Sequence, residues 1–523
     1  MKKTILNISL VLSLLVTFTS CKKSLTNYYN NPEKSTTASV PTLFTGMLND
    51  DRVRPAYWNL RTYLMIQAAI YSQTASFPNS GNAYQQNDGY TGQYWSDFYY
   101  PAGNGSGPLG TYRTMEQVYN SLPADQQANQ AVFMQAAKVF LYERTAKMID
   151  AWGDIPFSEA GNLETHSTIK DPKFDDAKTL YSTLISGLND AATYFSTASN
   201  LPANVKAAFA KQDILLSGNL DMWRRYANSI RLRLLMRTSF VDEATAKTAV
   251  TTMLASSASY PLIDGGNVGN YNPATSDVLL QPLSTNLNSP LNAITEGGSY
   301  SAPDYMLNTV MLPANDPRIP VIFAKYGNPT YKAMPITFTA DQQENNYTKY
   351  SIVDSTTFLN NIKLPGILIT AAEVNFLKAE ANERWGNDAD AQTNYNTALQ
   401  QSVSFFYYLN AIGGGKVPYP SASTISTFVN SSTAAFSGTS TQKLGLIWTQ
   451  KWLNYGFMQA DEAWSEYRRT KYPQLTFVNQ TQAGYQIPPT RLVYPSVESS
   501  NNSNYNTVRG KDTRTTKIFW DVK

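Results

Sequence analysis

Apolar residues recur at intervals of three and four along most of this chain, and this spacing constrains the fold more than any other feature. The clearest stretch covers 131–150, where one side carries Phe133, Ala137, Phe140, Leu141 and Met148. The other side carries largely Lys138, Glu143, Lys147 and Asp150. The pattern is typical of an amphipathic helix that packs through one face, so we expect a mainly α-helical protein.

Similar patterns predict further helices over 41–75, 175–195 and 441–469, and another from Asp221 onward. Asp175 and Asp176 stand where an anion favours the start of a helix. The helix from Asp221 places Trp223, Ala227, Ile230 and Leu234 on one stripe. These stripes are the expected packing faces.

A group of small and aromatic residues indicates how the helices pair. Ala379, Ala391, Tyr395 and Ala398 are separated by 12, 4 and 3 positions, as in a tetratricopeptide hairpin. A weaker match to the same pattern occurs at Ala177, Tyr181 and Leu184. We therefore predict a tetratricopeptide-like helical-repeat scaffold with long irregular loops and minor β structure.

The segment 258–365 breaks the helical pattern. It is rich in Pro, Asn and Gly and has only short helical possibilities and a few extended stretches. We interpret it as a loop-rich insertion between helical repeats, and loops of that size are commonly functional.

The N-terminus has the organisation of a secreted, lipid-anchored protein. Lys2 and Lys3 precede a mostly apolar run over 5–18, which is too short for a membrane-spanning helix. Cys21 follows this run and resembles the lipidated residue of a bacterial lipobox. Because it is the sole cysteine, the chain cannot form an intrachain disulfide. We predict a signal peptide at 1–20, a flexible leader at 21–40 lipidated on Cys21, and a single ligand-binding domain at 41–523.

Charge and composition limit the partners. The chain carries a net charge of +3, and removal of Lys2 and Lys3 with the signal peptide leaves +1. This balance gives no strong general attraction to nucleic acid or anionic membranes. Only 15% of residues are charged, whereas 34 are tyrosines. Such a surface favours neutral hydrogen bonds and aromatic contacts.

Catalytic and metal-binding motifs are scarce. One His and one Cys cannot supply an ordinary zinc site, and a Ser-His-Asp triad would depend on His166 in a polar loop. Asp154 and Glu159 could form a glycosidase pair, but Gly153-Asp154 also fits a helix-ending turn. Asp316 and Arg318 could face a ligand or clamp a proline turn. We predict no catalytic residue, metal site or cofactor. Calcium binding by oxygen-rich loops stays open, although the sequence contains no EF-hand spacing.

A carbohydrate site needs aromatic ring faces surrounded by amide and charged groups. The segment 84–95 supplies both, and Tyr84 and Tyr90 are its candidate ligand-binding residues. Tyr300, beside Gly297-Gly298, is a further candidate. The alternative is that these aromatics are core, and Trp95 is excluded because its i, i+4 spacing with Tyr99 fits a packed helix.

Several strings together resemble the SusD/RagB family of nutrient-binding outer-membrane lipoproteins, in its SusD-like branch. They are Asn30-Asn31-Pro32, Ala151-Trp152-Gly153-Asp154-Ile155-Pro156-Phe157-Ser158-Glu159-Ala160, Trp223-Arg224-Arg225-Tyr226-Ala227-Asn228-Ser229-Ile230-Arg231-Leu232-Arg233, Asp316-Pro317-Arg318, Thr370-Ala371-Ala372-Glu373-Val374-Asn375-Phe376-Leu377-Lys378-Ala379-Glu380-Ala381 and Glu462-Ala463-Trp464-Ser465-Glu466-Tyr467-Arg468-Arg469-Thr470. Their order and spread cover nearly the whole mature chain.

The resemblance implies a lipid-anchored protein on the outer membrane, facing outward, which forms a lid over a SusC-like TonB-dependent transporter and delivers oligosaccharides or peptides. Lys22 and Lys23 depart from the pattern, because surface-exposed lipoproteins of the usual hosts often carry acidic residues there. The orientation therefore stays open. Two other functions also stay open: a surface glycan hydrolase and a tetratricopeptide-type scaffold that binds proteins.

The predicted anchor can be tested by replacing Cys21 with Ser. Without a thiol the chain cannot be lipidated, so the Cys21→Ser protein should lose lipid labelling and move from the membrane fraction to the soluble fraction. Ser24→Ala, three residues further on, is the matched control and should stay in the membrane. Unchanged membrane retention of the Cys21→Ser protein would contradict the anchor.

Overall fold

The computed structural model describes residues 38–75, 81–101, 104–161, 171–266, 268–283, 289–296 and 300–523. The predicted signal peptide, Cys21 and most of the 21–40 leader lie outside these residues, as does His166. No helix within the described part of the chain is long and apolar enough to cross a membrane.

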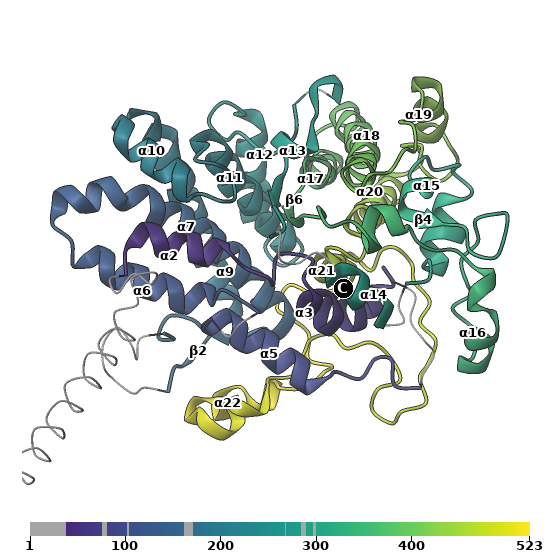
Figure 1. Ribbon diagram of the computed structural model, residues 1–523, viewed down its shortest axis with the longest axis horizontal. Coiled ribbons are helices and arrows are strands. Elements are labelled where there is room, and N and C mark those ends of the chain that lie inside the picture. Colours follow the sequence, from purple (N-terminus) through teal and green to yellow (C-terminus); the bar gives the residue numbers. More distant parts are fainter. Residues whose placement is uncertain are drawn as a thin grey trace, which may run out of the picture.

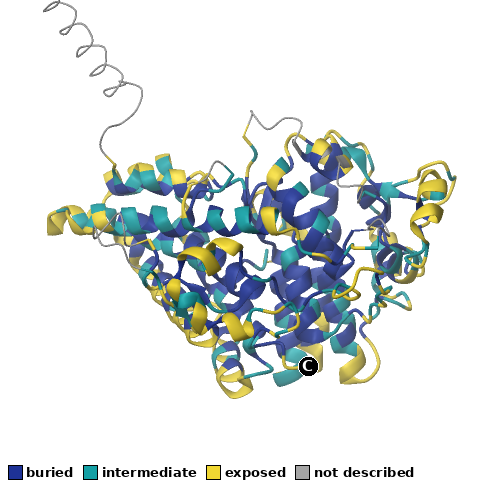
Figure 2. Ribbon diagram, turned by 90° about the horizontal axis from the view of Figure 1, so that it is seen from below, coloured by how far each residue is buried: buried dark blue, intermediate teal, exposed yellow. Residues whose placement is uncertain are grey.

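Helices dominate the structure, and the longer ones pack side by side across the molecule (Figure 1). They are α2 (Val40–Leu48), α5 (Asp88–Tyr99), α6 (Pro108–Asn120), α7 (Ala124–Trp152), α9 (Ala177–Thr197), α10 (Ala203–Gln212), α11 (Leu220–Thr238), α12 (Glu243–Ala255), α17 (Ala371–Trp385), α18 (Asp388–Ile412), α19 (Ala422–Val429), α20 (Ser440–Tyr455) and α21 (Ala460–Thr470). Buried residues occupy the centre of the molecule, and exposed ones its rim (Figure 2).

Shorter elements connect these helices. They are α3 (Tyr57–Asn59), α4 (Ala69–Ser72), α13 (Pro273–Ser276), α14 (Ser289–Glu296), α15 (Ile319–Ile322), α16 (Ala340–Asn346) and α22 (Ser496–Asn501). Three are π-helices, namely η1 (Leu60–Ala68), η4 (Tyr305–Met311) and η6 (Ser355–Leu359). The 3-10 turns are η2 (Ala198–Asn200), η3 (Val268–Asn270), η5 (Tyr347–Lys349), η7 (Ser503–Thr507) and η8 (Arg509–Lys511).

The β structure within the described residues is limited to three two-stranded antiparallel pairs. Strand β1 (Ile155–Pro156) pairs with β2 (Phe174–Asp175), β3 (Val278–Leu280) with β6 (Gly366–Ile369), and β4 (Phe323–Ala324) with β5 (Ile352–Val353). Much of the irregular structure falls in 258–365, where short helices alternate with these strands. The mainly α fold with irregular loops and minor β is confirmed.

The hairpin formed by α17 and α18 shows the repeat most clearly. Ala379 on α17 and Ala391, Tyr395 and Ala398 on α18 are all fully buried. The two helices pack closely and are joined by only Gly386 and Asn387, and Asn387 caps α18 by accepting a hydrogen bond from the Asp390 N–H at 2.9 Å. The tetratricopeptide-like arrangement predicted from these four positions is therefore confirmed.

Two predicted helices are interrupted. The stretch 41–75 contains α2, α3, η1 and α4, with a turn over 51–55, because Pro55 has no N–H for a helical hydrogen bond and the Asp50 carboxylate accepts the Arg52 N–H instead. The stretch 441–469 divides into α20 and α21 at Gly456, whose φ of +50° ends the first helix. Periodicity continues across both breaks because each side packs into the same core.

The charged side of α7 also differs from the prediction. Glu143, Lys147 and Asp150 are buried rather than lying on a face opposite the core. Lys147 Nζ lies 2.8 Å from Asp461 and 3.5 Å from Glu462. The spacing of residues along α7 could not predict this burial. It assigns charged residues to the exterior, whereas here α21 supplies their charged partners in the interior.

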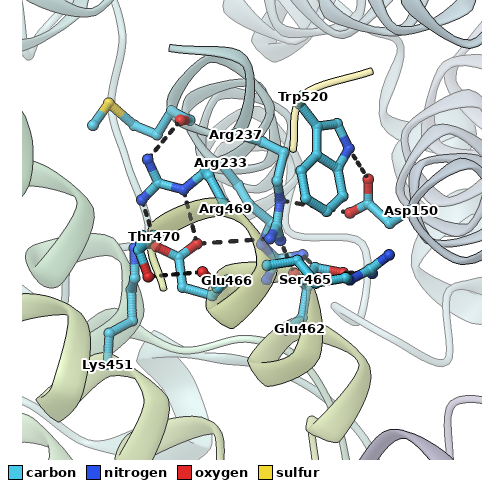
Figure 3. A network of polar contacts seen from close by, with 12 residues as sticks. Asp150, Arg233, Arg237, Lys451, Glu462, Ser465, Glu466, Arg469, Thr470 and Trp520 are labelled. Atoms are coloured by element: carbon cyan, nitrogen blue, oxygen red, sulfur yellow. Dashed lines mark hydrogen bonds and ion pairs between the residues drawn. The ribbon is translucent and has the colours of Figure 1, made fainter. Parts of the chain in front are cut away.

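These residues belong to a buried ionic network that joins α7, α11, α17, α20 and α21. Figure 3 shows members of this network on α7, α11, α20 and α21. Arg469 of α21 forms two hydrogen bonds to Glu380 of α17, at 2.7 and 2.8 Å, and also pairs with Glu466. Lys451 of α20 lies 2.8 Å from Glu466. Arg237 Nη2 of α11 donates to the Glu462 carboxylate at 2.5 Å. Each of these helices is thus fixed to the others by charge as well as by apolar packing.

The network controls the ionisation of its carboxylates. Burial alone would raise the pKa of Glu380, but Arg469 and Lys451 outweigh it and hold the pKa at about 2. Burial would likewise raise the pKa of Glu462, whereas Arg233, Lys147 and Arg237 hold it at about 2. Both carboxylates therefore stay charged in the interior.

Substitution of Ala391 with Leu tests the hairpin. The added methylene groups would press on α17, so the free energy of unfolding should fall by about 1–3 kcal/mol. Urea unfolding followed by circular dichroism gives the measurement. Ala389→Leu, on the exposed side of α18, is the matched control and should change stability little. Equal stability of the two variants would contradict a close helix crossing at Ala391.

Substitution of Glu380 with Gln tests the network. It removes one of the two carboxylates that Arg469 and Lys451 share and leaves them only Glu466, so the free energy of unfolding at pH 7 should fall by about 3–5 kcal/mol. The pKa of Glu380 is depressed in the folded state, so its contribution is present above pH 4.5 and is lost as the pH falls toward about 2.

The difference in stability between wild type and the Glu380→Gln protein should therefore shrink over that interval in urea titrations. The control is Glu344→Gln, which removes an exposed carboxylate on α16. A difference between wild type and Glu380→Gln that is constant with pH would argue against the charged form of Glu380.

Candidate ligand-binding site

Two pairs of side chains, Tyr57 with Trp58 and Arg61 with Tyr90, lie on neighbouring turns of the chain and on α5, and we call them the aromatic–arginine patch. All nine tryptophans lie within the described residues, and only Trp58 is counted among the exposed side chains, with 43% of its surface accessible. Its ring meets Tyr57 edge-on at a centroid distance of 5.0 Å. Arg61 lies one helical turn further on, and its guanidinium carbon is 5.9 Å from the centre of the Tyr90 ring.

The backbone beneath the patch is held firmly. Arg52 Nη1 donates to the carbonyl oxygen of Trp58 at 2.8 Å, and its guanidinium pairs with Asp97 of α5 at 2.7 Å. Asn87 caps α5 by accepting the Tyr90 N–H at 3.1 Å. The segment carrying Trp58 and the helix carrying Tyr90 are thereby fixed to each other through Arg52 and Asp97.

The chain continues from Trp58 and Asn59 directly into the π-helix η1. Such helices are rare and are often found at functional sites, because the wider turn redirects side chains. The Arg61 Nε is buried and has no hydrogen-bond partner within the described residues. The patch therefore offers ring faces, which bind the C–H surface of a sugar, beside a partly exposed arginine.

A second aromatic group lies in the irregular insertion and contains Tyr300, Tyr326 and Tyr347. Tyr326 and Tyr347 are 38% and 39% exposed, and Tyr300 is partly exposed. Burial raises the pKa of Tyr300, and the nearby hydroxyls of Tyr347 and Tyr326 raise it further. Gly327 permits this approach, since a Cβ there would lie 1.9 Å from the Thr348 carbonyl oxygen.

Helix α14 contacts the elements that carry Trp58 and Arg61, and also an element close to Tyr300. It packs against α3 and η1 of the aromatic–arginine patch, and also against η6. Tyr300 is near η6, because its carbonyl oxygen accepts the Val353 N–H at 2.7 Å just before η6 begins. The structure therefore brings two aromatic groups to the neighbourhood of one short helix.

The three tyrosines predicted from sequence have different positions. Tyr84 is fully buried, with its ring edge-on to Phe477 at 6.1 Å, so it presents no ring face to a ligand. Tyr90 lies on α5 rather than in a loop and belongs to the aromatic–arginine patch. Tyr300 belongs to the second group. Trp95 is buried against Tyr99, as its spacing indicated.

Sequence reasoning missed Trp58, Arg61, Tyr326 and Tyr347. A signal for Trp58 was present, since it lies outside the apolar stripe that continues through Leu60 and Leu64. For Tyr326 and Tyr347 the sequence contained no signal, because their proximity to Tyr300 depends on the pairing of β4 with β5.

The carboxylates considered for catalysis have structural contacts. Asp154 follows Gly153, whose φ of +82° ends α7, and it accepts the Ala177 N–H at 2.9 Å and pairs with Lys511 at 2.9 Å. Glu159 accepts the Lys173 N–H at 3.2 Å. Asp316 and Arg318 form a fully buried ion pair at 2.6 Å, so they clamp the proline turn between them rather than face a ligand.

No group of three or more potential metal ligands occurs in the part of the chain that the structure describes.

Aromatic rings beside an arginine on a helical-repeat scaffold are groups that carbohydrate-binding proteins use. A family model named SusD-like and described as starch-binding and associating with the outer membrane matches residues 31–495. The chain belongs to this SusD-like family. None of the curated proteins matched it.

Solved structures share the fold over nearly their whole length. A chitin-binding protein superimposes with a TM-score of 0.72 and 20% identity, covering 92% of this chain and 100% of its own. A chitin-binding SusD homolog from Flavobacterium johnsoniae gives 0.70 and 19%, with 92% and 99% covered. A SusD-like protein from Bacteroides thetaiotaomicron gives 0.69 and 20%, with 92% and 99% covered. At these identities the likeness establishes the fold.

Proposed function

We propose that this protein captures a glycan on the aromatic–arginine patch and passes it, chemically intact, to a SusC-like TonB-dependent transporter in the outer membrane. Lipid on Cys21 tethers it there, with the ligand-binding domain facing outward. The observation that carries the proposal is the exposed Trp58 ring beside the Arg61–Tyr90 pair, in a member of a family described as starch-binding. The domain 41–523 acts as one unit in this proposal.

The patch suits a neutral oligosaccharide. Ring faces stack on the C–H surface of a pyranose, and the partly exposed Arg61 side chain lies beside the Tyr90 ring. Two similar structures carry the description chitin-binding, whereas the family is described as starch-binding. Both glycans are neutral chains of glucose-type rings, so α-glucan and chitin fragments are the first ligands to test. The Tyr300 group would extend the site along α14 toward a longer chain.

The proposed role is non-catalytic. Hydrolysis of a glycosidic bond needs two carboxyl groups about 5–9.5 Å apart on either side of it. Near the patch, the Asp97 carboxylate is ion-paired with Arg52, which also donates to the Trp58 carbonyl oxygen. Asp154 and Glu159, the pair suggested by sequence, are engaged by backbone N–H groups. A surface glycan hydrolase would release shortened products, whereas the proposed protein returns its ligand unchanged.

Ala substitutions at Trp58 and Tyr90 test the site. Each removes a ring face, so the affinity for a bound maltooligosaccharide or chitooligosaccharide should fall by about 0.5–1.5 kcal/mol, or roughly 2–13-fold. Titration calorimetry measures the affinity. Tyr100→Ala is the matched control, because Tyr100 is a 56% exposed ring at the other end of the helix that carries Tyr90. It should leave binding unchanged.

The outcomes separate the parts of the proposal. Binding that is insensitive to both substitutions would overturn the patch as the site, and variants of Tyr300 and Tyr326 would then be compared. Chromatographic detection of cleaved glycan would overturn the non-catalytic role. Co-purification with diverse proteins but no TonB-dependent transporter would favour a protein-interaction scaffold instead.

A further inference from the structure

Helices α9, α11 and α12 border an open groove, which we call the Arg231 groove. One hollow has Lys178 and Asn189 of α9 on one wall and Arg231 of α11 on the other. A second hollow continues along α12, where it is lined by Thr245, Thr248 and again Arg231. Because Arg231 and Thr245 border both hollows, the two form a single groove. None of its lining residues belongs to the aromatic–arginine patch or to the Tyr300 group.

Arg231 is partly buried in this groove and lacks an acidic partner. Its Nε and Nη1 atoms are shielded from solvent, yet neither has a hydrogen-bond partner within the described residues. Its guanidinium carbon lies 5.8 Å from the centre of the Tyr260 ring. The Asp242 carboxylate, which also borders the groove, accepts the Thr245 N–H at 3.3 Å and caps α12. Burial lowers the pKa of Arg231, as expected for a cation without a nearby anion.

The other arginines of α11 contrast with Arg231. Arg225 pairs with Asp221, Arg233 with Glu373, Arg237 with Glu462, and Arg224 donates to the carbonyl oxygens of Ala258 and Ser259. Arg224 Nε and Arg237 Nη1 also lack a hydrogen-bond partner within the described residues, but each of these four guanidinium groups has an ion pair or a hydrogen bond through another nitrogen, whereas no such contact is found for Arg231 there. A shielded guanidinium without a partner is costly, and a ligand carboxylate would relieve that cost.

We propose that the Arg231 groove binds an extended, acidic peptide segment of a partner protein, with a glutamate or aspartate carboxylate of that segment paired to Arg231. Because Nε and Nη1 are shielded, the carboxylate would pair with Arg231 through the remaining nitrogen, Nη2, in a charge-assisted hydrogen bond. Thr245, Thr248 and Thr252 follow α12 for about 10 Å, which is the length of about three residues of extended chain. Their hydroxyls can pair with the backbone of such a chain.

The groove favours a peptide over a sugar because its aromatic rings already pack against other side chains, and Phe519, which is partly exposed, meets Tyr181 edge-on at 5.3 Å. Tyr181 on its border is buried, and the Tyr260 ring is faced by the Arg231 guanidinium. The walls carry the hydroxyl groups of Ser182, Thr245 and Thr248 among apolar side chains. This inference is independent of glycan binding, since the two surfaces share no residue.

A peptide array provides the test. Hexapeptides with glutamate fixed at a central position are compared with the same sequences carrying glutamine, and the affinity of the best binders is measured by fluorescence anisotropy. The glutamate peptides should bind at least roughly tenfold more tightly, as for a hydrogen bond to a charged group. Arg231→Gln should remove this preference.

Two further variants keep the test decisive. Thr248→Glu leaves Arg231 in place but fills the groove with a carboxylate of the chain itself, so it should also abolish binding of acidic peptides. Arg225→Gln removes the same charge from the same helix outside the groove and should retain binding. Thermal unfolding and glycan binding at the Trp58 patch show that each variant is folded.

Three results would overturn the proposal. They are equal binding of glutamate and glutamine peptides, a preference for glutamate that survives Arg231→Gln, and binding of oligogalacturonate but no peptide in an Arg231-dependent manner. The last result would reassign the groove to acidic sugars.

Discussion

The pairing of Glu380 with Arg469 is the interaction on which the rest of the structure depends. Both side chains are fully buried, and they join α17 to α21 at the centre of the ionic network. A buried ion pair adds little net stability over an apolar contact, but it tolerates only the correct partner. We interpret the network as the feature that selects one packing of these helices among several apolar alternatives. The helices and connecting segments that carry the aromatic groups are positioned by that packing.

The sequence predicted the helices well where an apolar stripe meets one neighbour, as with Ala391 and Tyr395 on α18. The prediction failed where a second helix packs against the face that spacing had assigned to solvent. Glu143 and Lys147 are on the charged side of α7, but α21 packs there and supplies Glu462 as a partner. The strings that carry the family resemblance include Arg233, Glu380, Glu462 and Arg469, so the resemblance already contained the network. Periodicity cannot detect it, because periodicity compares residues along one helix only.

The site was less predictable than the fold. Tyr84 and Tyr90 occur in the same polar, aromatic segment, but Tyr84 packs against Phe477 whereas Tyr90 meets Arg61 on the surface. The difference arises from segments distant in sequence, since Phe477 lies almost 400 residues from Tyr84. Composition therefore identified the chemistry of the site, namely aromatic rings among neutral polar groups. Tertiary packing decided which rings are available.

The exposure of Trp58 has an optical consequence. The other eight tryptophans are buried or partly buried, so their indole groups emit from surroundings that are less polar than water. Trp58 is therefore the main source of the long-wavelength edge of the intrinsic fluorescence and the indole most open to aqueous quenchers. Occupancy of the aromatic–arginine patch can thus be followed in the unlabelled protein, in real time and without any dye.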